Sequence, residues 1–259
     1  MIPFRRILFP VDLSEPSRRA AAYVKAMAER FHSEVLVLHV MELPTAMYAP
    51  PEGATWATLS NAEKMKEHYR LLFHAFVRSD FYPMKVREEF LEGDAAHEIT
   101  DLCHRGEIDL IMMMTHGHGP FRRLLLGSTT AKVLHDCDCP VWTGVHTADL
   151  DARDPKRLHS ILCAVDTPEK DATVIEWANS FAKGSGAEVR MVHAQSHPDQ
   201  VVQHDAQKGA ADLVIIGRTH SKLSALRSNA YEIIRQSPCP VISVQRTAYA
   251  SFGTTNAAR

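Results

Sequence analysis

An internal duplication limits the folds that this chain can adopt. The segment Ile7–Asp12 reads ILFPVD, Ile161–Asp166 reads ILCAVD, and the correspondence continues without a gap to His39 and His193. A chain that repeats a strand, a helix and a second strand at fixed spacing contains two copies of one structural unit. A length of 259 residues also fits two domains, on the usual prior of ~100–200 residues per domain.

Strands and helices are expected to alternate along the first copy. Ser14 is a candidate N-cap with Pro16 in the first turn, and Thr167 with Pro168 takes the same role in the second copy. Alternation of buried strands with helices predicts an α/β fold with a parallel sheet. The expected strands cover residues 5–12, 34–40, 84–91, 109–114 and 140–145, and the expected helices cover 15–31, 62–76, 94–106 and 128–135.

The second copy is shorter than the first. After His193 the register changes, and Asp212 corresponds to Asp109, so the segment equivalent to Met41–Leu91 is missing. The polar stretch Thr147–Arg157 is the best linker candidate. We therefore expect a complete first domain at residues 1–148, a shortened second domain at 157–246 and a small, polar, disordered tail at 247–259.

Composition excludes several classes of function. Lys plus Arg number 29 and Asp plus Glu 31, a net charge of −2, which argues against a nucleic-acid partner. The apolar runs are short and the N-terminus leads straight into a strand, so neither a membrane span nor a signal peptide is expected. Five scattered cysteines, an odd number, predict no disulfide framework and a reducing, cytoplasmic compartment.

Glycines that could admit a ligand occur in the first copy only. Thr115–Gly119 reads THGHG and Leu126–Thr129 reads LGST, whereas the second copy has Arg218–His220 and Arg227–Asn229 instead. In an open parallel sheet, ligands bind beyond the carboxyl ends of the strands. Such glycines let backbone amides approach an anion, and a helix that begins with hydroxyl side chains adds the positive end of its dipole. Asp12, at the end of the first strand, suits a ribose because a carboxylate accepts hydrogen bonds from paired hydroxyls.

With these residues assembled, the chain resembles the universal stress protein family in its tandem-domain form. That family holds ATP with a Gly-x-x-Gly-x9-Gly-Ser/Thr loop, which here reads Met114-x-x-Gly117-x9-Gly127-Ser128. The departure is Met114, whose side chain could crowd the α-phosphate or the ribose. The resemblance implies two Rossmann-like, adenine nucleotide alpha hydrolase-like domains, and ATP as ligand, with AMP or ADP as alternatives and Mg²⁺ as a companion ion.

The resemblance also implies the site residues. Asp12 would contact the ribose and Val40 the adenine through its backbone, while the phosphates would lie on the glycines of the loop and the start of the following helix. No comparable nucleotide site is expected in the second copy. The complete predicted set is Pro10, Val11, Asp12, Val40, Met113, Met114, Gly117, His118, Gly127, Ser128 and Thr129.

Other interpretations of the same residues stay open. Asp12 could simply organise the strand-to-helix turn, and the glycines could simply permit turns. Five further residues could be read as zinc ligands: His116, His118, His135, Cys137 and Cys139. A zinc site is the weaker interpretation of them, because Cys-x-Cys lacks a second pair at ligand spacing. No metal is predicted. A slow ATPase or autokinase, with Ser128 or Thr129 accepting phosphate, and a nucleotide-independent scaffold are the alternatives to a regulatory ATP-binding protein; no catalytic residue is predicted.

The last strand of each copy suggests how the halves associate. Relatives built from single domains often dimerise through this strand, and both copies have kept it. We therefore expect Val141–Val145 and Val241–Val244 to pair about a pseudo-two-fold axis. We also expect two such chains to form a homodimer, because the shortened second copy would expose an apolar surface, and we expect a protein partner that the sequence does not identify.

Overall fold

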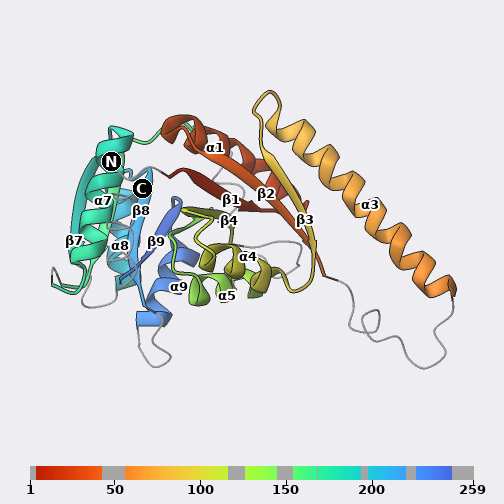
Figure 1. The fold of residues 1–259 in the computed structure, drawn as a ribbon. Helices are drawn as coiled ribbons and strands as arrows, with labels where there is room; N and C mark the ends of the chain where they lie inside the picture. The colour runs from red at the N-terminus through yellow and green to blue at the C-terminus, as the bar shows by residue number, and fades with distance from the viewer. Residues whose placement is uncertain are drawn as a thin grey trace, which may run out of the picture.

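The computed structural model describes residues 4–42, 56–115, 126–144, 154–167, 169–193, 198–219 and 226–246 (Figure 1). The first half comprises β1 Arg6–Pro10, α1 Glu15–Phe31, β2 Glu34–Met41, α3 Trp56–Phe81, β3 Arg87–Glu92, α4 Ala95–His104, β4 Leu110–Met114, α5 Ser128–Asp136 and β5 Val141–Gly144. The second half comprises β6 Ser160–Val165, α7 Ala172–Ser185, β7 Glu188–His193, α8 Pro198–Lys208, β8 Leu213–Arg218, α9 Leu226–Gln236 and β9 Val241–Gln245. The fold is therefore the predicted α/β class.

All strands join one sheet in the order β3-β2-β1-β4-β5-β9-β8-β6-β7. Within each half the neighbouring strands are parallel, and the two halves meet where β5 and β9 pair antiparallel, with Trp142 opposite Ile242. This confirms the predicted association of the two last strands. Because β5 and β9 both lie inside the sheet, neither offers its edge to a second chain.

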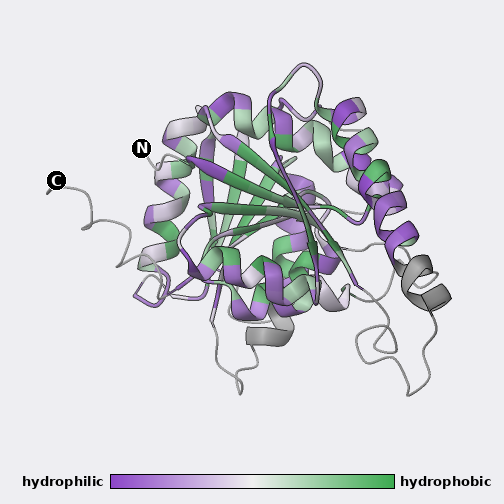
Figure 2. Cartoon of the chain, turned by 45° about the vertical axis from the view of Figure 1, so that its right-hand side comes forward, coloured by the Kyte–Doolittle hydropathy of each residue, from purple (hydrophilic) through white to green (hydrophobic). Residues whose placement is uncertain are grey.

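Helices cover both faces of this sheet, and the core lies in two layers between them. One layer packs α1, α3 and α7 against the strands and includes Phe73, Trp142 and Phe181. The other layer packs α4, α5, α8 and α9 against the opposite face of the strands and includes Ile99 and Val133. Figure 2 shows the consequence: the strands in the middle of the sheet are mostly hydrophobic, while the helices turn hydrophilic residues outward. None of the described helices is long and apolar enough to cross a membrane.

Local boundaries differ most from the expectations at α3 and α7. α3 begins at Trp56 and ends at Phe81, well beyond the predicted 62–76. Ser14 caps α1 as predicted, accepting a hydrogen bond from the amide of Ser17. The prediction that Thr167 caps the corresponding helix was wrong, because α7 begins at Ala172 with Asp171 in the N-cap position. The carboxylate of Asp171 has other partners, described below.

No disulfide framework was expected, but one pair of cysteines is bonded. Cys103 at the end of α4 and Cys139 before β5 form a disulfide, with their Cα atoms 6.5 Å apart. This pair could not be predicted from the sequence, because α4 and the start of β5 become neighbours only when the sheet forms. Three cysteines that form no disulfide among the described residues are buried: Cys137, Cys163 and Cys239. Burial raises the pKa of Cys137 and of Cys163 to about 12, so these thiols are unreactive at neutral pH.

Candidate functional site

The predicted site residues gather at one point of the sheet edge. From β1 the chain passes to β2 on one side, while β4 lies on the other, so a topological switch point falls between β1 and β4. The structure places Pro10–Asp12 at the carboxyl end of β1, Val40 near the end of β2, Met113 and Met114 at the end of β4, and Gly127–Thr129 at the start of α5. Gly117 and His118 lie outside the described residues.

Asp12 organises the turn that follows β1. Its Oδ1 accepts hydrogen bonds from the amide of Ser14 at 3.0 Å, from the hydroxyl of Ser14, and from the hydroxyl of Ser17 at 2.7 Å. Between them, Leu13 adopts a left-handed backbone with φ 61°, a conformation that non-glycine residues hold only where their surroundings enforce it. The turn-forming reading of Asp12 is thus correct, and the same contacts fix its exposed carboxylate at the mouth of the switch point.

His39 ties the ends of β1 and β2 together beneath this turn. Its Nδ1 lies 2.8 Å from the carbonyl oxygen of Val11, and its ring stacks with Tyr69 and Phe73 of α3. Burial lowers the pKa of His39, against the opposing effects of the Val11 carbonyl and the Asp12 charge. The neutral ring therefore donates its Nδ1–H to Val11. Sequence reasoning treated His39 only as a strand end and missed this role.

The stability of the fold is expected to depend on pH through His39. As the pH falls below about 6.5, the unfolded chain takes up a proton at His39 before the folded protein does, so folding stability declines. In the variant His39→Asn, which keeps an N–H for Val11 but cannot titrate, this part of the decline should vanish. Urea unfolding at about pH 7.5 and 5.5 measures it. Identical pH dependence in the two proteins would contradict the assignment.

The direction of the Val40 backbone groups follows from the register between β1 and β2. The amide of Val11 donates to the carbonyl of Leu38, the last point at which β1 reaches β2. Backbone groups alternate sides along a strand. Two residues further on, the backbone groups of Val40 therefore point to the β1 side again, beyond the end of that strand. They face the switch point, where a flat polar ring could pair with them.

Helix α5 begins at this edge without a capping side chain. Gly127 occupies its N-cap position, where it has no side chain to offer the first-turn amides. The amide of Gly127 donates to the carbonyl of Thr115 at 2.9 Å, and the hydroxyl of Thr130 donates to the carbonyl of Met114 at 3.0 Å. These bonds hold the start of α5 against the end of β4. Helix N-termini of this kind bind anions through their backbone amides.

Met114 packs away from the switch point. An added Cβ at Gly144, its neighbour across β4 and β5, would lie 2.7 Å from the Met114 sulfur, so the thioether already occupies the space above Gly144. The corresponding pair in the second half is reversed, with Gly217 on β8 opposite Val244 on β9. The large and the small residue have exchanged strands. Where Met114 replaces the first glycine of the loop, the facing position on β5 is therefore a glycine, Gly144.

An ion pair fills the equivalent place in the second half. Asp171, which corresponds to Ser17, is fully buried and accepts from the amide of Asp166 at 2.6 Å and from Nε of Arg246 at 2.6 Å. The two side chains lie directly over Gly217, where an added Cβ would meet Arg246 at 2.7 Å and Asp171 at 2.9 Å. The exposed Lys170 pairs with the carboxylate of Asp166. The second half therefore satisfies this edge with its own side chains.

Metal-binding groups do not gather in the described part of the chain. Among those residues no three His, Cys, Asp or Glu side chains are placed to hold one ion. Of the residues considered for zinc, Cys139 is bonded to Cys103, and His116 and His118 lie outside the described residues.

Comparison with known proteins assigns the family. The family model described as "Universal stress protein family" matches residues 3–143, more than half of the 259-residue chain. The chain belongs to the universal stress protein family. Curated universal stress proteins agree: MJ0531 of Methanocaldococcus jannaschii is 31% identical over 138 residues, covering 53% of this chain and 80% of its own length. A Thermus aquaticus universal stress protein is 33% identical over 140 residues, covering 53% and 96%.

A solved structure extends the likeness to both halves of this universal stress protein. The crystal structure of a universal stress protein from Archaeoglobus fulgidus covers 93% of this chain and 96% of its own, with a TM-score of 0.66 and 20% identity. At that identity the match shows the fold alone. This universal stress protein thus has the Rossmann-like fold of its family, and the matches of the two curated relatives each cover about half of it.

Proposed function

We propose that the first half binds an adenine nucleotide, with ATP as the main ligand, and that occupancy regulates the affinity of the protein for a partner. The observation that carries the proposal is the uncapped start of α5 at Gly127, held against β4 at the same switch point as Asp12. A nucleotide site needs backbone amides, which carry partial positive charge, to bind the phosphates. It also needs a carboxylate to accept hydrogen bonds from the sugar hydroxyls. Membership of the universal stress protein family supports the same ligand.

Each part of the nucleotide has a group suited to it. The backbone of Val40, beyond the end of β1, pairs with the adenine edge. Asp12, fixed by Ser14 and Ser17, accepts from the ribose hydroxyls. The amides and hydroxyls of Ser128 and Thr129 bind the phosphates at the start of α5. Met114, turned toward Gly144, leaves the space between β1 and β4 to the ligand.

The second half takes no nucleotide in this proposal. A ligand there would have to displace the buried pair of Asp171 and Arg246, and separating such a pair leaves an uncompensated buried charge.

Adding a negative charge at Gly127 should abolish most of the affinity. In Gly127→Glu the new carboxylate would face the phosphates, and like charges about 4 Å apart repel by roughly 1–4 kcal/mol, so we expect ATP to bind at least about fivefold more weakly. Gly127→Gln, which adds a side chain of the same size without charge, is the matched control and should retain more affinity. Isothermal titration with ATP measures both.

Two outcomes would count against the proposal. If the native protein shows no binding at about millimolar ATP, corresponding to a binding free energy weaker than about −4 kcal/mol, the nucleotide function fails. If Gly127→Glu and Gly127→Gln bind ATP equally, the phosphates do not lie at the start of α5. Nucleotide released from freshly purified native protein, identified by mass spectrometry, tells which adenine nucleotide is bound.

A further inference from the structure

Helix α5 connects the candidate nucleotide site to the second half of the chain. It has nine residues, which corresponds to a rod about 13 Å long. Its first residue, Ser128, lies at the switch point, where Gly127 and Thr130 bond to the end of β4. Its last residue, Asp136, lies at the junction with the second half. A short rigid helix transmits a shift of one end to the other, so whatever holds the far end also sets the position of the first-turn amides.

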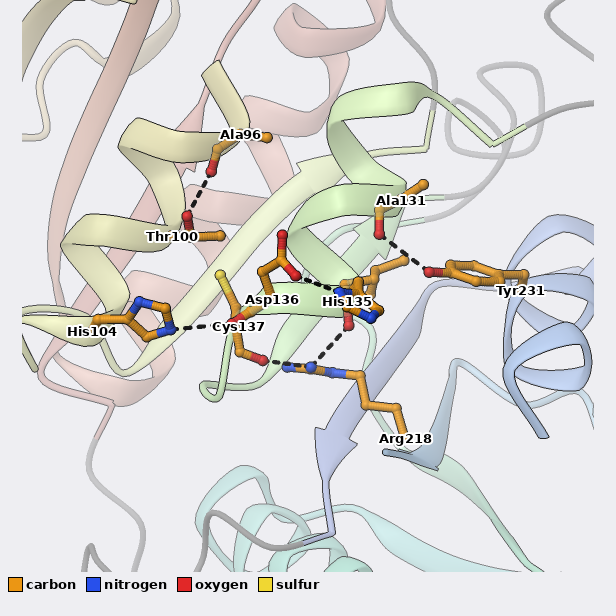
Figure 3. Close-up of polar contacts among 10 residues, drawn as sticks. Ala96, Thr100, His104, Ala131, His135, Asp136, Cys137, Arg218 and Tyr231 are labelled. Atoms are coloured by element: carbon orange, nitrogen blue, oxygen red, sulfur yellow. Dashed lines mark hydrogen bonds and ion pairs between the residues drawn. The ribbon is translucent and has the colours of Figure 1, made fainter. Parts of the chain in front are cut away.

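Two residues of the second half hold α5, Arg218 at its far end and Tyr231 near the middle of the helix. Arg218, the last residue of β8, donates from Nη1 to the carbonyls of Leu134 at 3.0 Å and Cys137 at 2.5 Å, and from Nη2 to Cys139 at 2.5 Å. The hydroxyl of Tyr231, on α9, donates to the carbonyl of Ala131 at 3.1 Å. Figure 3 shows both side chains directed at the carbonyls of α5 and of the turn that follows it.

Burial makes the Arg218 contact rigid. The side chain is 7% exposed, and its hydrogen bonds among the described residues all go to main-chain carbonyls. Burial lowers the pKa of Arg218 to about 10, so the guanidinium remains charged at neutral pH. The carbonyls at a helix C-terminus carry the negative end of its dipole and suit a cation. If α5 moved away, this buried charge would lose its acceptors, which costs far more than an ordinary surface contact.

We propose that Arg218, assisted by Tyr231, is a positioning residue for the nucleotide site of the first half, acting through α5. The shortened second half thereby serves as an internal clamp on the phosphate-binding helix. This inference rests on the proposed nucleotide function. Because coupling between two sites is reciprocal, nucleotide bound at the start of α5 should in turn strengthen the contact between Arg218 and the end of α5.

The test compares two arginines that both bond across the two halves. Arg30, on α1, donates to the carbonyls of Ser185 at 2.6 Å and Lys156 at 2.7 Å and does not touch α5. In the full-length protein, Arg218→Met should weaken ATP binding about tenfold, within the range of coupling carried by residues that do not touch a ligand. Arg30→Met should leave ATP affinity within about twofold, although it also loses two bonds between the halves.

Milder variants keep the test decisive if Arg218→Met does not fold. Arg218→Lys keeps a buried cation that can reach one or two of the carbonyls, and its ATP affinity should lie between native and Arg218→Met. Tyr231→Phe removes only the hydroxyl bond to Ala131 and should weaken ATP binding about twofold. Native affinity in both a folded Arg218 variant and Tyr231→Phe would overturn the proposal, as would equal losses in Arg218→Met and Arg30→Met.

Hydrogen exchange separates this proposal from the nucleotide function itself. Without nucleotide, the amides of α5 should exchange faster in Arg218→Met than in Arg30→Met, a readout that needs no ATP. With ATP, native protein should gain protection in α9, and Arg218→Met should not. If the native protein does not bind ATP, the nucleotide function fails while the exchange of α5 still tests the clamp. If it binds ATP but α9 gains no protection, the clamp fails alone.

Discussion

Replacement of Arg246 by methionine is expected to lower the free energy of unfolding by about 3–5 kcal/mol, the usual cost of removing one partner from a buried ion pair. Asp171 is fully buried, and its Oδ1 lies 2.6 Å from Nε of Arg246, which is itself only 11% exposed. Without the guanidinium, the carboxylate keeps the amide of Asp166 and loses its only countercharge among the described residues. Urea unfolding of native and variant protein measures the loss.

Two further variants show whether charge is the cause. Lys156→Met breaks the ion pair between Lys156 and Glu29. Because these two side chains are 74% and 56% exposed, the free energy of unfolding should fall by less than about 1 kcal/mol. The double variant Asp171→Ser, Arg246→Met introduces the serine that the first half has at Ser17 and removes both charges. It should recover part of the stability lost in Arg246→Met. Equal losses in Arg246→Met and Lys156→Met would contradict a buried pair.

The duplication explains why so much of the fold could be predicted. A repeated strand, helix and strand predicts two sets of parallel strands, and the retention of both last strands predicts the pairing of β5 with β9, which joins the two sets into one sheet. The predicted residues at the switch point follow from the same topology, since parallel strands bring their carboxyl ends to one edge. Local sequence pattern and strand order are therefore enough to predict where a residue lies when its position depends on the backbone alone.

Side-chain partners that are distant in the sequence could not be predicted. Asp171 precedes a helix and looks like an ordinary cap, yet its carboxylate pairs with Arg246, 75 residues away. Arg218 reads as a charged residue at a strand end, and its acceptors lie in the other half of the chain. His39 and His193 are identical in the sequence, but α3 covers the first, while the second lies exposed on an edge strand. Only tertiary structure separates these cases.

Introducing valine at Gly144 is expected to lower the free energy of unfolding by about 1–3 kcal/mol, as overpacking of a close-packed interior does. A Cβ at this position would lie 2.7 Å from the Met114 sulfur and 3.2 Å from Cη2 of Trp142. The thioether fills this space, and the indole ring, 1% exposed, leaves the added side chain no other direction in which to shift. The loss appears as a lower urea midpoint with an unchanged slope.

A second substitution should restore this stability. The pair Met114→Gly, Gly144→Val reproduces the arrangement of Gly217 and Val244 in the second half, so the removed thioether makes room for the added valine. Residues in contact are expected to depart from additivity by about 0.5–3 kcal/mol, here in the stabilising direction. A double variant no more stable than Gly144→Val would show that the two positions do not share one space.

The same double variant decides what Met114 does to the nucleotide. It restores the glycine with which the loop of the family begins, at the end of β4. Because the thioether lies toward β5 and away from β1, we expect the ATP affinity of the double variant to stay within about twofold of native. A larger gain in affinity would mean that Met114 swings into the space between β1 and β4. The first half would then be a nucleotide site held partly closed by one side chain, which a single exchange of residues across two strands opens.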